Sequence, residues 1–426
     1  MPSPYSVRPF DVLHYLTLPR LEATLRVRLE FTGRLDAAAL RQAFTLSVQT
    51  VPVIAASFHT NFLRAHWRPH PEQAQEICAA VAADSPAAAA AAVTTAWEAG
   101  IDVTTGPNAQ ATLVQGPAGD TLVVRFSHLV GDVAAFRAWL AEVARLYTAL
   151  VAGQPAVPAP FKTRAVSPAL RSLPFGRRFR LFFSMPSSKG RVRTAGLERP
   201  DGPGRSVVVR VPAPAFAAAH ERARADGVTV NALLVAACGR AECRRTGMDR
   251  VDFPFTVDLR PLVPAGQKYG ITNLTANAWA SVTPGAGTLA DTARAVAEAT
   301  ADVPRRDELW AGTDFLRVAT KYIPYAFFYA VYGRNAKIQP LILTNWGVWP
   351  EADVRFGEAP ARLTGAAGFK PSPTLQVNAC TFRGELTLTA SVKTDDAGAA
   401  AVQGLLADMA AEIKALGRGP AVAAGA

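Results

Sequence analysis

The stretch from Ala111 to Gly153 limits the fold of this chain more than any other part of its sequence. It begins with two runs of alternating apolar and polar residues joined by GPAGD, a pattern that predicts a β-hairpin whose second strand ends at His128. The following residues repeat apolar side chains every three or four positions, which predicts an amphipathic helix over 134–153. A hairpin followed directly by such a helix indicates a chain that packs helices beside a sheet. The apolar stripe of the helix consists of Phe136, Leu140, Val143 and Tyr147.

Strands and helices alternate in the same way through both halves of the sequence. The helix over 85–100 has clear boundaries, with Ser85 as N-cap, Pro86 at the first helical position and Gly100 past the end. The sequence therefore predicts an α/β (α+β) fold in two lobes of similar size. The expected strands are 21–33, 53–69, 205–212, 251–262, 339–348, 374–384 and 385–395, and the other expected helices are 34–52, 214–227, 229–247, about 310–333 and about 396–416.

A break in this pattern marks the domain boundary. From Gln154 to about Gly204 the sequence is rich in proline, serine and arginine, with the apolar island RFRLFFSM inside it. We therefore expect an N-terminal lobe over 1–160, a connector over 161–204 and a C-terminal lobe over 205–426. The chain has 426 residues, about two to three times the usual size of one domain, which agrees with two units.

Positive charge is concentrated in the connector. Residues 161–205 hold eleven Lys and Arg against Glu198 and Asp201, so they carry +9 of the net charge of +11. The rest of the chain is close to neutral, which argues against a broad face for nucleic acid. A local basic strip fits an acidic protein partner or a phosphate-bearing cofactor, and a solvated linker explains it equally well.

Other features suggest a protein of a reducing compartment without a metal site. The N-terminus lacks the charged start and apolar run of a signal peptide, and no uncharged apolar run is long enough to span a membrane, so we expect a cytoplasmic location. His66 and His70 are four residues apart in HWRPH, where the proline breaks the spacing of a metal site. His14, His59 and His220 are interpreted as surface or core residues. The four cysteines are too scattered for disulfides or zinc: Cys78, Cys238, Cys243 and Cys380.

His128 and Asp132 are the candidate catalytic residues. Alternation places Leu122, Val124, Phe126 and His128 on one face of the strand, so the histidine ends an apolar face where the chain turns toward a helix. Asp132 is placed to brace that turn by accepting from backbone amides or by pairing with an arginine. A lone His-x-x-x-Asp pattern is weak, and a structural histidine is the alternative.

This region resembles the superfamily of condensation domains and CoA-dependent acyltransferases. The group includes peptide condensation domains, chloramphenicol acetyltransferase and polyketide-associated acyltransferases, and its signature is HHxxxDG before an amphipathic helix that ends in Leu-Tyr. Here the stretch reads SHLVGDV, followed by AAFRAWLAEVARLY, so the second histidine maps on His128 and the aspartate on Asp132. Further likenesses follow in the family order over roughly residues 10–415: GRLDAAALRQAF, TVNALLVAACGRA, FTVDLRPLVPAG, LTNWG and LQVNACTFRGELTLTASV.

The resemblance implies two chloramphenicol-acetyltransferase-like lobes in a V, with a tunnel between them and the histidine midway along it. Three departures stand out: Ser127 replaces the first histidine, Val133 replaces the glycine after the aspartate, and the usual RHPxLR segment appears as VQTVPVIAAS. An arginine braces the aspartate in the superfamily, and Arg260 in VDLRP is chosen for that part. The departures leave open a degenerate copy without catalysis.

The leading hypothesis is an acyltransferase or condensation enzyme of natural-product or lipid biosynthesis. Neutral imidazole, whose ordinary pKa is about 6.5, suits proton removal from an alcohol or amine acceptor near neutral pH. The acceptor then attacks a carrier-protein or CoA thioester directly, without an acyl-enzyme. A carrier-binding protein without chemistry, or an enzyme of the same fold that cyclises, dehydrates or epimerises a tethered substrate, are the alternatives.

The same resemblance implies substrate and partner contacts. Ser127, Thr344, Asn345, Trp346, Tyr325 and Tyr329 are candidates for substrate binding, although the aromatic stretch 322–332 and Trp346 fit core packing as well. No permanently bound cofactor is expected, because acyl-CoA or a phosphopantetheinyl thioester serves as co-substrate. The expected partner is an acidic acyl or peptidyl carrier protein or CoA, with a small-molecule acceptor and a monomeric enzyme. Candidate phosphate contacts are Arg177, Arg178, Arg180, Lys189 and Arg191.

Overall fold

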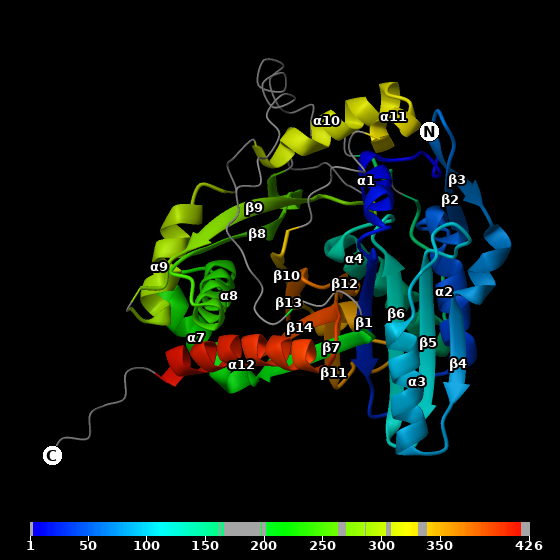
Figure 1. Cartoon of the computed structure of the whole chain (residues 1–426). Helices are drawn as coiled ribbons and strands as arrows, with labels where there is room; N and C mark the ends of the chain where they lie inside the picture. Colours follow the sequence, from blue (N-terminus) through cyan, green and yellow to red (C-terminus); the bar gives the residue numbers. More distant parts are fainter. Residues whose placement is uncertain are drawn as a thin grey trace.

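The computed structural model describes residues 3–161, 163–165, 197, 202–262, 270–285, 287–303, 308–330 and 339–418. Its strands form two main sheets, and each sheet lies at the centre of one half of the molecule (Figure 1). Two separate apolar clusters of buried residues accompany the two halves. The predicted mixture of helices and sheets in two lobes is confirmed.

The first lobe is built on the sheet β11-β1-β6-β5-β4. Helices α2 and α4 pack against each other, whereas α3 lies against β5 and β6 from the other side, where Trp97 packs with Val123. A short hairpin, β2–β3, stands apart from the sheet. The elements are α1 (Pro9–Thr17), β1 (Thr24–Glu30), α2 (Ala37–Ser47), β2 (Ala56–Thr60), β3 (Ala65–Pro69), β4 (Cys78–Ala82), α3 (Pro86–Glu98), β5 (Ala109–Gly116), β6 (Gly119–Ser127) and α4 (Val133–Val151).

The second lobe is built on the sheet β12-β14-β13-β10-β8-β9, with β7 paired to β14. Helices α7, α8 and α12 pack together, and α9 joins them through α8. The elements are β7 (Gly204–Val211), α7 (Ala213–Ala225), α8 (Val230–Thr246), β8 (Val251–Asp258), β9 (Thr275–Val282), α9 (Leu289–Thr300), α10 (Glu308–Tyr322), α11 (Tyr325–Phe328), β10 (Leu341–Trp349), β12 (Lys370–Pro371), β13 (Leu375–Phe382), β14 (Glu385–Lys393) and α12 (Asp396–Arg418).

The second half of the chain also contributes to the first lobe. Strand β11 (Arg362–Ala366) pairs antiparallel with β1, which places it at the edge of the first sheet. Helix α10 contacts both α1 and β9, and with α11 it lies at the top of Figure 1. Strand β11 and helix α10 therefore both tie the lobes together, and a division of the chain at 160 and 205 does not separate all residues of one lobe from those of the other.

Most expected elements are present, with three differences of detail. The segment 53–69 is not one strand but the hairpin β2–β3, because Asn61 Oδ1 accepts from the backbone N–H groups of Leu63 (3.0 Å) and Arg64 (2.8 Å) and closes a turn. The helix expected over 310–333 is divided between α10 and α11 at Pro324, where proline cannot donate a backbone hydrogen bond. Strand β6 ends at Ser127, one residue earlier than expected.

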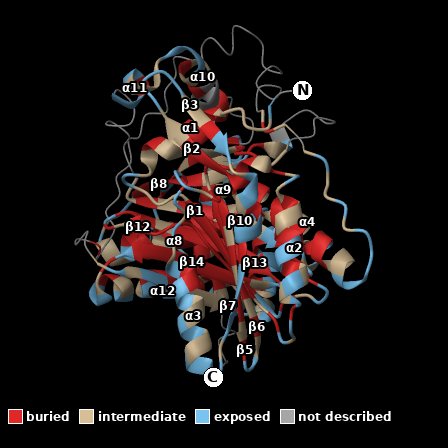
Figure 2. Ribbon diagram, turned by 90° about the vertical axis from the view of Figure 1, so that its right-hand side faces the viewer, coloured by how far each residue is buried: buried red, intermediate tan, exposed pale blue. Residues whose placement is uncertain are grey.

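Burial follows the two sheets. Figure 2 shows their strands buried and the outer sides of α3 and α12 exposed. All four cysteines are buried free thiols. Among the described residues, no helix has both the length and the apolar character needed to cross a bilayer. Of the predicted connector, 162, 166–196 and 198–201 lie outside the described residues.

Candidate active site

The end of β6 positions His128. The His128 backbone N–H donates to the carbonyl of Ala23 beside the start of β1 (2.8 Å), so the register of the two strands continues to this residue. The chain then turns: the Ser127 carbonyl accepts from Val130 N–H (3.0 Å), and Ser127 Oγ accepts from Leu129 N–H (3.3 Å). The histidine therefore stands at the second position of a closed turn, Ser127–Val130, between a strand and a helix.

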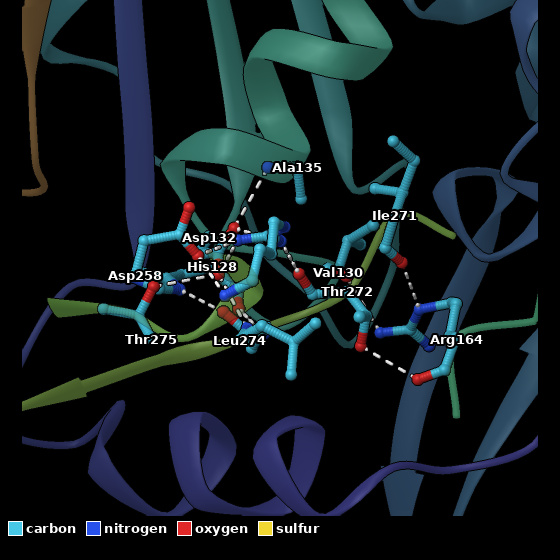
Figure 3. A network of polar contacts seen from close by, with 12 residues as sticks. His128, Val130, Asp132, Ala135, Arg164, Asp258, Ile271, Thr272, Leu274 and Thr275 are labelled. Atoms are coloured by element: carbon cyan, nitrogen blue, oxygen red, sulfur yellow. Dashed lines mark hydrogen bonds and ion pairs between the residues drawn. The ribbon is translucent and has the colours of Figure 1, made fainter. Parts of the chain in front are cut away.

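Asp132 fixes the far end of this turn. It is the N-cap of α4, where Oδ1 accepts from Ala135 N–H (3.0 Å). Its Oδ2 accepts from Leu274 N–H (2.7 Å) and from Thr275 Oγ1 (2.9 Å), both at the start of β9 (Figure 3). Asp132 thus joins the helix of the first lobe to a strand of the second.

Arg260 completes the contacts of Asp132. Its two terminal nitrogens donate to the two carboxylate oxygens at 2.8 and 3.0 Å, the bidentate geometry that favours Arg over Lys. Arg260 lies where the sequence analysis placed it and also donates to the Thr272 carbonyl (2.9 Å). Burial alone raises the pKa of Asp132, but the Arg260 guanidinium and the amides of Leu274 and Ala135 outweigh it and hold that pKa below its usual value. Asp132 is a charged brace with both oxygens occupied.

Asn273 determines which nitrogen of His128 carries a proton. The Asn273 side-chain amide donates to the His128 carbonyl (2.9 Å), which fixes the orientation of the amide group. Its oxygen then faces His128 Nδ1 at 3.0 Å and accepts from it. In the neutral ring the proton is therefore on Nδ1, and Nε2 carries a lone pair. A ring in this state accepts a proton at Nε2.

His14 packs on the same imidazole. The two rings are stacked with centroids 4.0 Å apart and an angle of 28° between their planes. Burial lowers the pKa of His128, with Asp132 acting in the opposite direction, and burial and the neighbouring His128 lower the pKa of His14 well below its usual range. Both residues nevertheless keep intermediate exposure.

A buried ion pair supports the turn from behind. Arg164 and Asp11 are both 1% exposed, with Arg164 Nη2 2.8 Å from Asp11 Oδ1. The same guanidinium donates to the carbonyls of Leu129 and Val130, each at 3.0 Å, and Figure 3 shows Arg164 beside Val130 and Ile271. Trp67 also donates to Asp11 (2.9 Å). Arg164 comes from the predicted connector, so this part of it holds the two residues after His128.

The residues proposed from strand 339–348 have partners other than His128. Thr344 accepts from Gln376 (2.9 Å), and Asn345 Oδ1 accepts from Gly347 N–H (2.9 Å). Trp346 is 4% exposed and donates to Asn378 (3.3 Å), so its indole N–H serves the core. Ser127 is fully buried and closes the turn described above. The structure gives these four residues packing and turn-forming contacts.

The two tyrosines lie over helix α1. Tyr325 is within 6.4 Å of Tyr15, measured between ring centroids, and stacks with Tyr329 at 6.2 Å. Because Tyr15 follows His14 on α1, this pair is close to the candidate site, and Tyr329 is 38% exposed.

The five cationic residues proposed for phosphate contacts, Arg177, Arg178, Arg180, Lys189 and Arg191, lie outside the described residues.

Four residues near the site were not identified from the sequence: His14, Asn273, Arg164 and Lys370. His14 and Asn273 reach His128 from distant parts of the chain, and neither stands in a motif of its own. The only usable signal for His14 was its polarity within the apolar run FDVLHYL, which the structure shows as helix α1. Its interpretation as a surface or core residue missed the contact with His128.

Replacing Asn273 with leucine is expected to lower kcat by about tenfold with little change in KM. The variant removes one hydrogen bond to a functional ring, an interaction of roughly 1 kcal/mol, and frees the imidazole to exchange tautomers. Steady-state kinetics of the wild type and the variant measure the effect. Gln376→Leu removes an amide hydrogen bond from β10 and β13 and serves as the matched control; equal losses in both variants contradict the positioning function of Asn273.

Comparisons with known proteins agree with this geometry at the level of the fold. No protein-family model and no curated protein matches the chain. The first condensation domain of the calcium-dependent antibiotic synthetase, in complex with a substrate analogue, is similar with a TM-score of 0.71 and 16% identity, covering 98% of both chains. Polyketide synthase associated protein 5 from Mycobacterium tuberculosis has a TM-score of 0.64 and 16% identity, covering 95% of this chain and 98% of that one.

A third similar structure performs a different reaction, judged by its name. The epimerization domain from the third module of tyrocidine synthetase B has a TM-score of 0.64 and 15% identity, covering 97% of this chain and 96% of that one. These likenesses extend over nearly the whole chain, so both lobes and their arrangement are shared. The chain has the two-lobed, chloramphenicol-acetyltransferase-like fold of the condensation domains.

Proposed function

We propose that the protein is an acyltransferase that moves an acyl group from a carrier-protein or CoA thioester to an alcohol or amine. The observation that carries this proposal is the fixed tautomer of His128, whose Nδ1 donates to Asn273 and whose Nε2 is left as a base. The resemblance of SHLVGDV to the condensation-domain signature supports His128 as the counterpart of the catalytic histidine. The likeness to a condensation domain of an antibiotic synthetase favours a reaction in natural-product or lipid biosynthesis.

The chemistry needs only one proton carrier. His128 Nε2 takes the proton of the acceptor O–H or N–H as its heteroatom attacks the thioester carbonyl carbon. The tetrahedral intermediate then breaks its C–S bond, and the thiolate receives the proton from the imidazolium. The products are an ester or amide and a free thiol, and no acyl-enzyme forms. Asp132 stays ionised throughout, because the Arg260 guanidinium holds its pKa below the usual value. Its function is to hold the turn and the second lobe together.

The proposed partners follow from charge. Residues 161–205 carry a net charge of +9, which complements an acidic carrier protein or the phosphates of CoA. The five arginines and lysines named from the sequence remain the candidate phosphate contacts, and a tunnel between the lobes remains the proposed route for the two substrates. The enzyme is proposed to act as a monomer in the cytoplasm, with no permanently bound cofactor, nucleic acid or membrane span.

A second candidate reaction has an observation of its own. The likeness to the epimerization domain of tyrocidine synthetase B favours proton transfer at a substrate carbon, since one base suffices to remove that proton. Such an enzyme removes the proton from one face, lets a proton from solvent add to the other face, and releases no thiol. A degenerate protein that only binds a carrier protein shows neither change.

The test uses octanoyl-CoA and an octanoyl carrier protein with a panel of alcohols and amines, and measures free thiol together with the mass of the product. Thiol release that depends on the acceptor, with a product heavier by one octanoyl group, supports acyl transfer. Deuterium uptake from solvent at the substrate α-carbon without thiol release supports proton transfer at carbon, the step that an epimerisation requires, instead. Binding of the carrier protein without thiol release or deuterium uptake supports a degenerate protein that only binds a carrier protein, and it contradicts both reactions.

The pH profile of kcat/KM provides a second test. Burial lowers the pKa of His128, so the ring is neutral and basic at pH 7 and becomes inactive only below its ordinary value of about 6.5. Activity is therefore expected to be level through neutral pH and to fall on the acid side, with an apparent pKa below 6.5. An acid limb centred above pH 7 contradicts a desolvated histidine as the base.

A further inference from the structure

Three buried cations lie close enough to Glu22 for its carboxylate to act on their pKa values. Arg26 is 0% exposed, Lys370 is 7% exposed and Arg125 is 8% exposed. The Glu22 carboxylate acts to raise the pKa of Lys370. It also forms a direct ion pair with Arg26. Buried charge is retained in proteins when it is paired or when it serves a ligand. Arg26 and Lys370 differ in how many of their N–H donors are bound to protein acceptors.

Arg26 is fully committed to the protein. It donates to the carbonyls of Trp97 (2.6 Å), Ala99 (3.0 Å) and Thr24 (3.3 Å) as well as to Glu22. Glu22 is occupied too, because its second carboxylate oxygen accepts from Phe369 N–H (2.9 Å). Arg26 and Glu22 therefore form a closed structural unit.

Lys370 differs in having little contact with protein acceptors. Its Nζ donates to the Glu22 carbonyl at 3.4 Å, which is the one hydrogen bond recorded for it among the described residues. An ammonium group has three donors, so two stay available for a ligand. Burial lowers the pKa of Lys370 to about 8, as expected for a cation that lacks a close counter-ion.

The position of Lys370 connects it to the candidate site. It contacts the carbonyl of Glu22, and the next carbonyl, that of Ala23, accepts from His128 N–H (2.8 Å). After burial and other neighbours, the Lys370 charge also lowers the pKa of both His128 and His14. The ammonium group of Lys370 is therefore close enough to the two stacked rings for its charge to act on both.

We propose that Lys370 is the counter-ion for a carboxylate carried by one of the two substrates at this site. The proposal rests on the proposed acyl transfer and narrows its substrate class. The single positive charge of one ammonium group, with two donors left over, matches the single negative charge of a carboxylate. The carboxylate belongs to the acceptor, as in a hydroxy acid, or to the acyl chain, as in a dicarboxylic thioester.

The experiment measures binding by calorimetry with only one substrate present, so that no turnover occurs. The acceptor arm compares 3-hydroxyoctanoate with 3-hydroxyoctanamide, and the donor arm compares succinyl-CoA with butyryl-CoA. The variant is Lys370→Met, which keeps the length of the side chain and places an apolar group in a buried position. Lys393→Met removes an exposed lysine from the adjacent strand β14 and is the control.

In one arm, the wild type is expected to bind the carboxylate at least tenfold more tightly than its neutral match. Lys370→Met is expected to weaken that carboxylate by about 10- to 100-fold, the loss of a charge-assisted hydrogen bond, and the neutral compound by less than about threefold. The arm that responds identifies the substrate that carries the charge. Lys393→Met is expected to change neither member of either pair.

Three outcomes overturn the proposal. The first is equal affinity for the carboxylates and their neutral matches in both arms, including no binding of any of them. The second is an unchanged affinity for the carboxylate in a Lys370→Met protein whose melting temperature equals that of the wild type. The third is an equal loss for charged and neutral compounds. The binding measurements do not depend on any reaction. If the protein shows the expected binding pattern but transfers no acyl group, the proposed function is wrong and the proposal for Lys370 still holds.

Discussion

Replacing His128 with alanine is expected to lower acceptor-dependent thiol release by about 10²- to 10⁴-fold. This range is the usual contribution of a positioned general base, and the turn offers no second base, because both oxygens of Asp132 are occupied by protein donors. The hydrogen bond between the backbone N–H at this position and Ala23 does not depend on the side chain. The fold is therefore expected to remain intact while the chemistry is lost.

The measurement pairs turnover with structure. Thiol release from octanoyl-CoA is followed with the acceptor that the wild type uses best, and circular dichroism and the melting temperature are recorded for the same samples. His220→Ala is the matched control, because His220 is an exposed histidine stacked on Phe216 in α7, in the second lobe. A His128→Ala protein that keeps more than about a tenth of wild-type turnover contradicts the general-base function.

The sequence predicts the local part of the candidate site well. The histidine, the turn and the N-cap aspartate lie within five consecutive positions, and strand alternation followed by helical spacing determines how they are placed. Arg260 was found through the resemblance of its DLRP segment to the acyltransferases. What remained hidden is non-local. Asn273 is 145 residues from His128, and no periodicity within either segment indicates that they meet.

The same limit applies to the fold. Strong amphipathic helices such as α4 and clear hairpins such as β5–β6 were predicted close to their observed bounds. Strand β4 was missed because its sequence CAAVA is rich in alanine, which has no preference for strands. Strand β11 was missed for another reason: its pairing with β1 in the other lobe depends on the docking of the lobes, which the pattern within either strand does not encode.

The largest effect on stability is expected from the buried pair of Asp11 and Arg164. Both side chains are 1% exposed, so replacing Asp11 with alanine leaves a guanidinium charge without its counter-ion in a desolvated position. Breaking a buried pair in this way costs about 3–5 kcal/mol of the free energy of unfolding. The Trp67 N–H loses its acceptor in the same variant, which adds to the loss.

Asp11→Ala is also expected to reduce catalysis, and this distinguishes the pair from an ordinary core contact. Arg164 holds the carbonyls of Leu129 and Val130, so a guanidinium that moves toward solvent releases the residues directly after His128. Urea denaturation is expected to show a lower midpoint with an unchanged slope, and thiol release is expected to fall at urea concentrations where the protein is still folded. Glu351→Ala, which breaks the exposed pair with Arg383, is expected to leave both measurements unchanged. A lower midpoint with full activity per folded molecule contradicts the link between this ion pair and the catalytic turn.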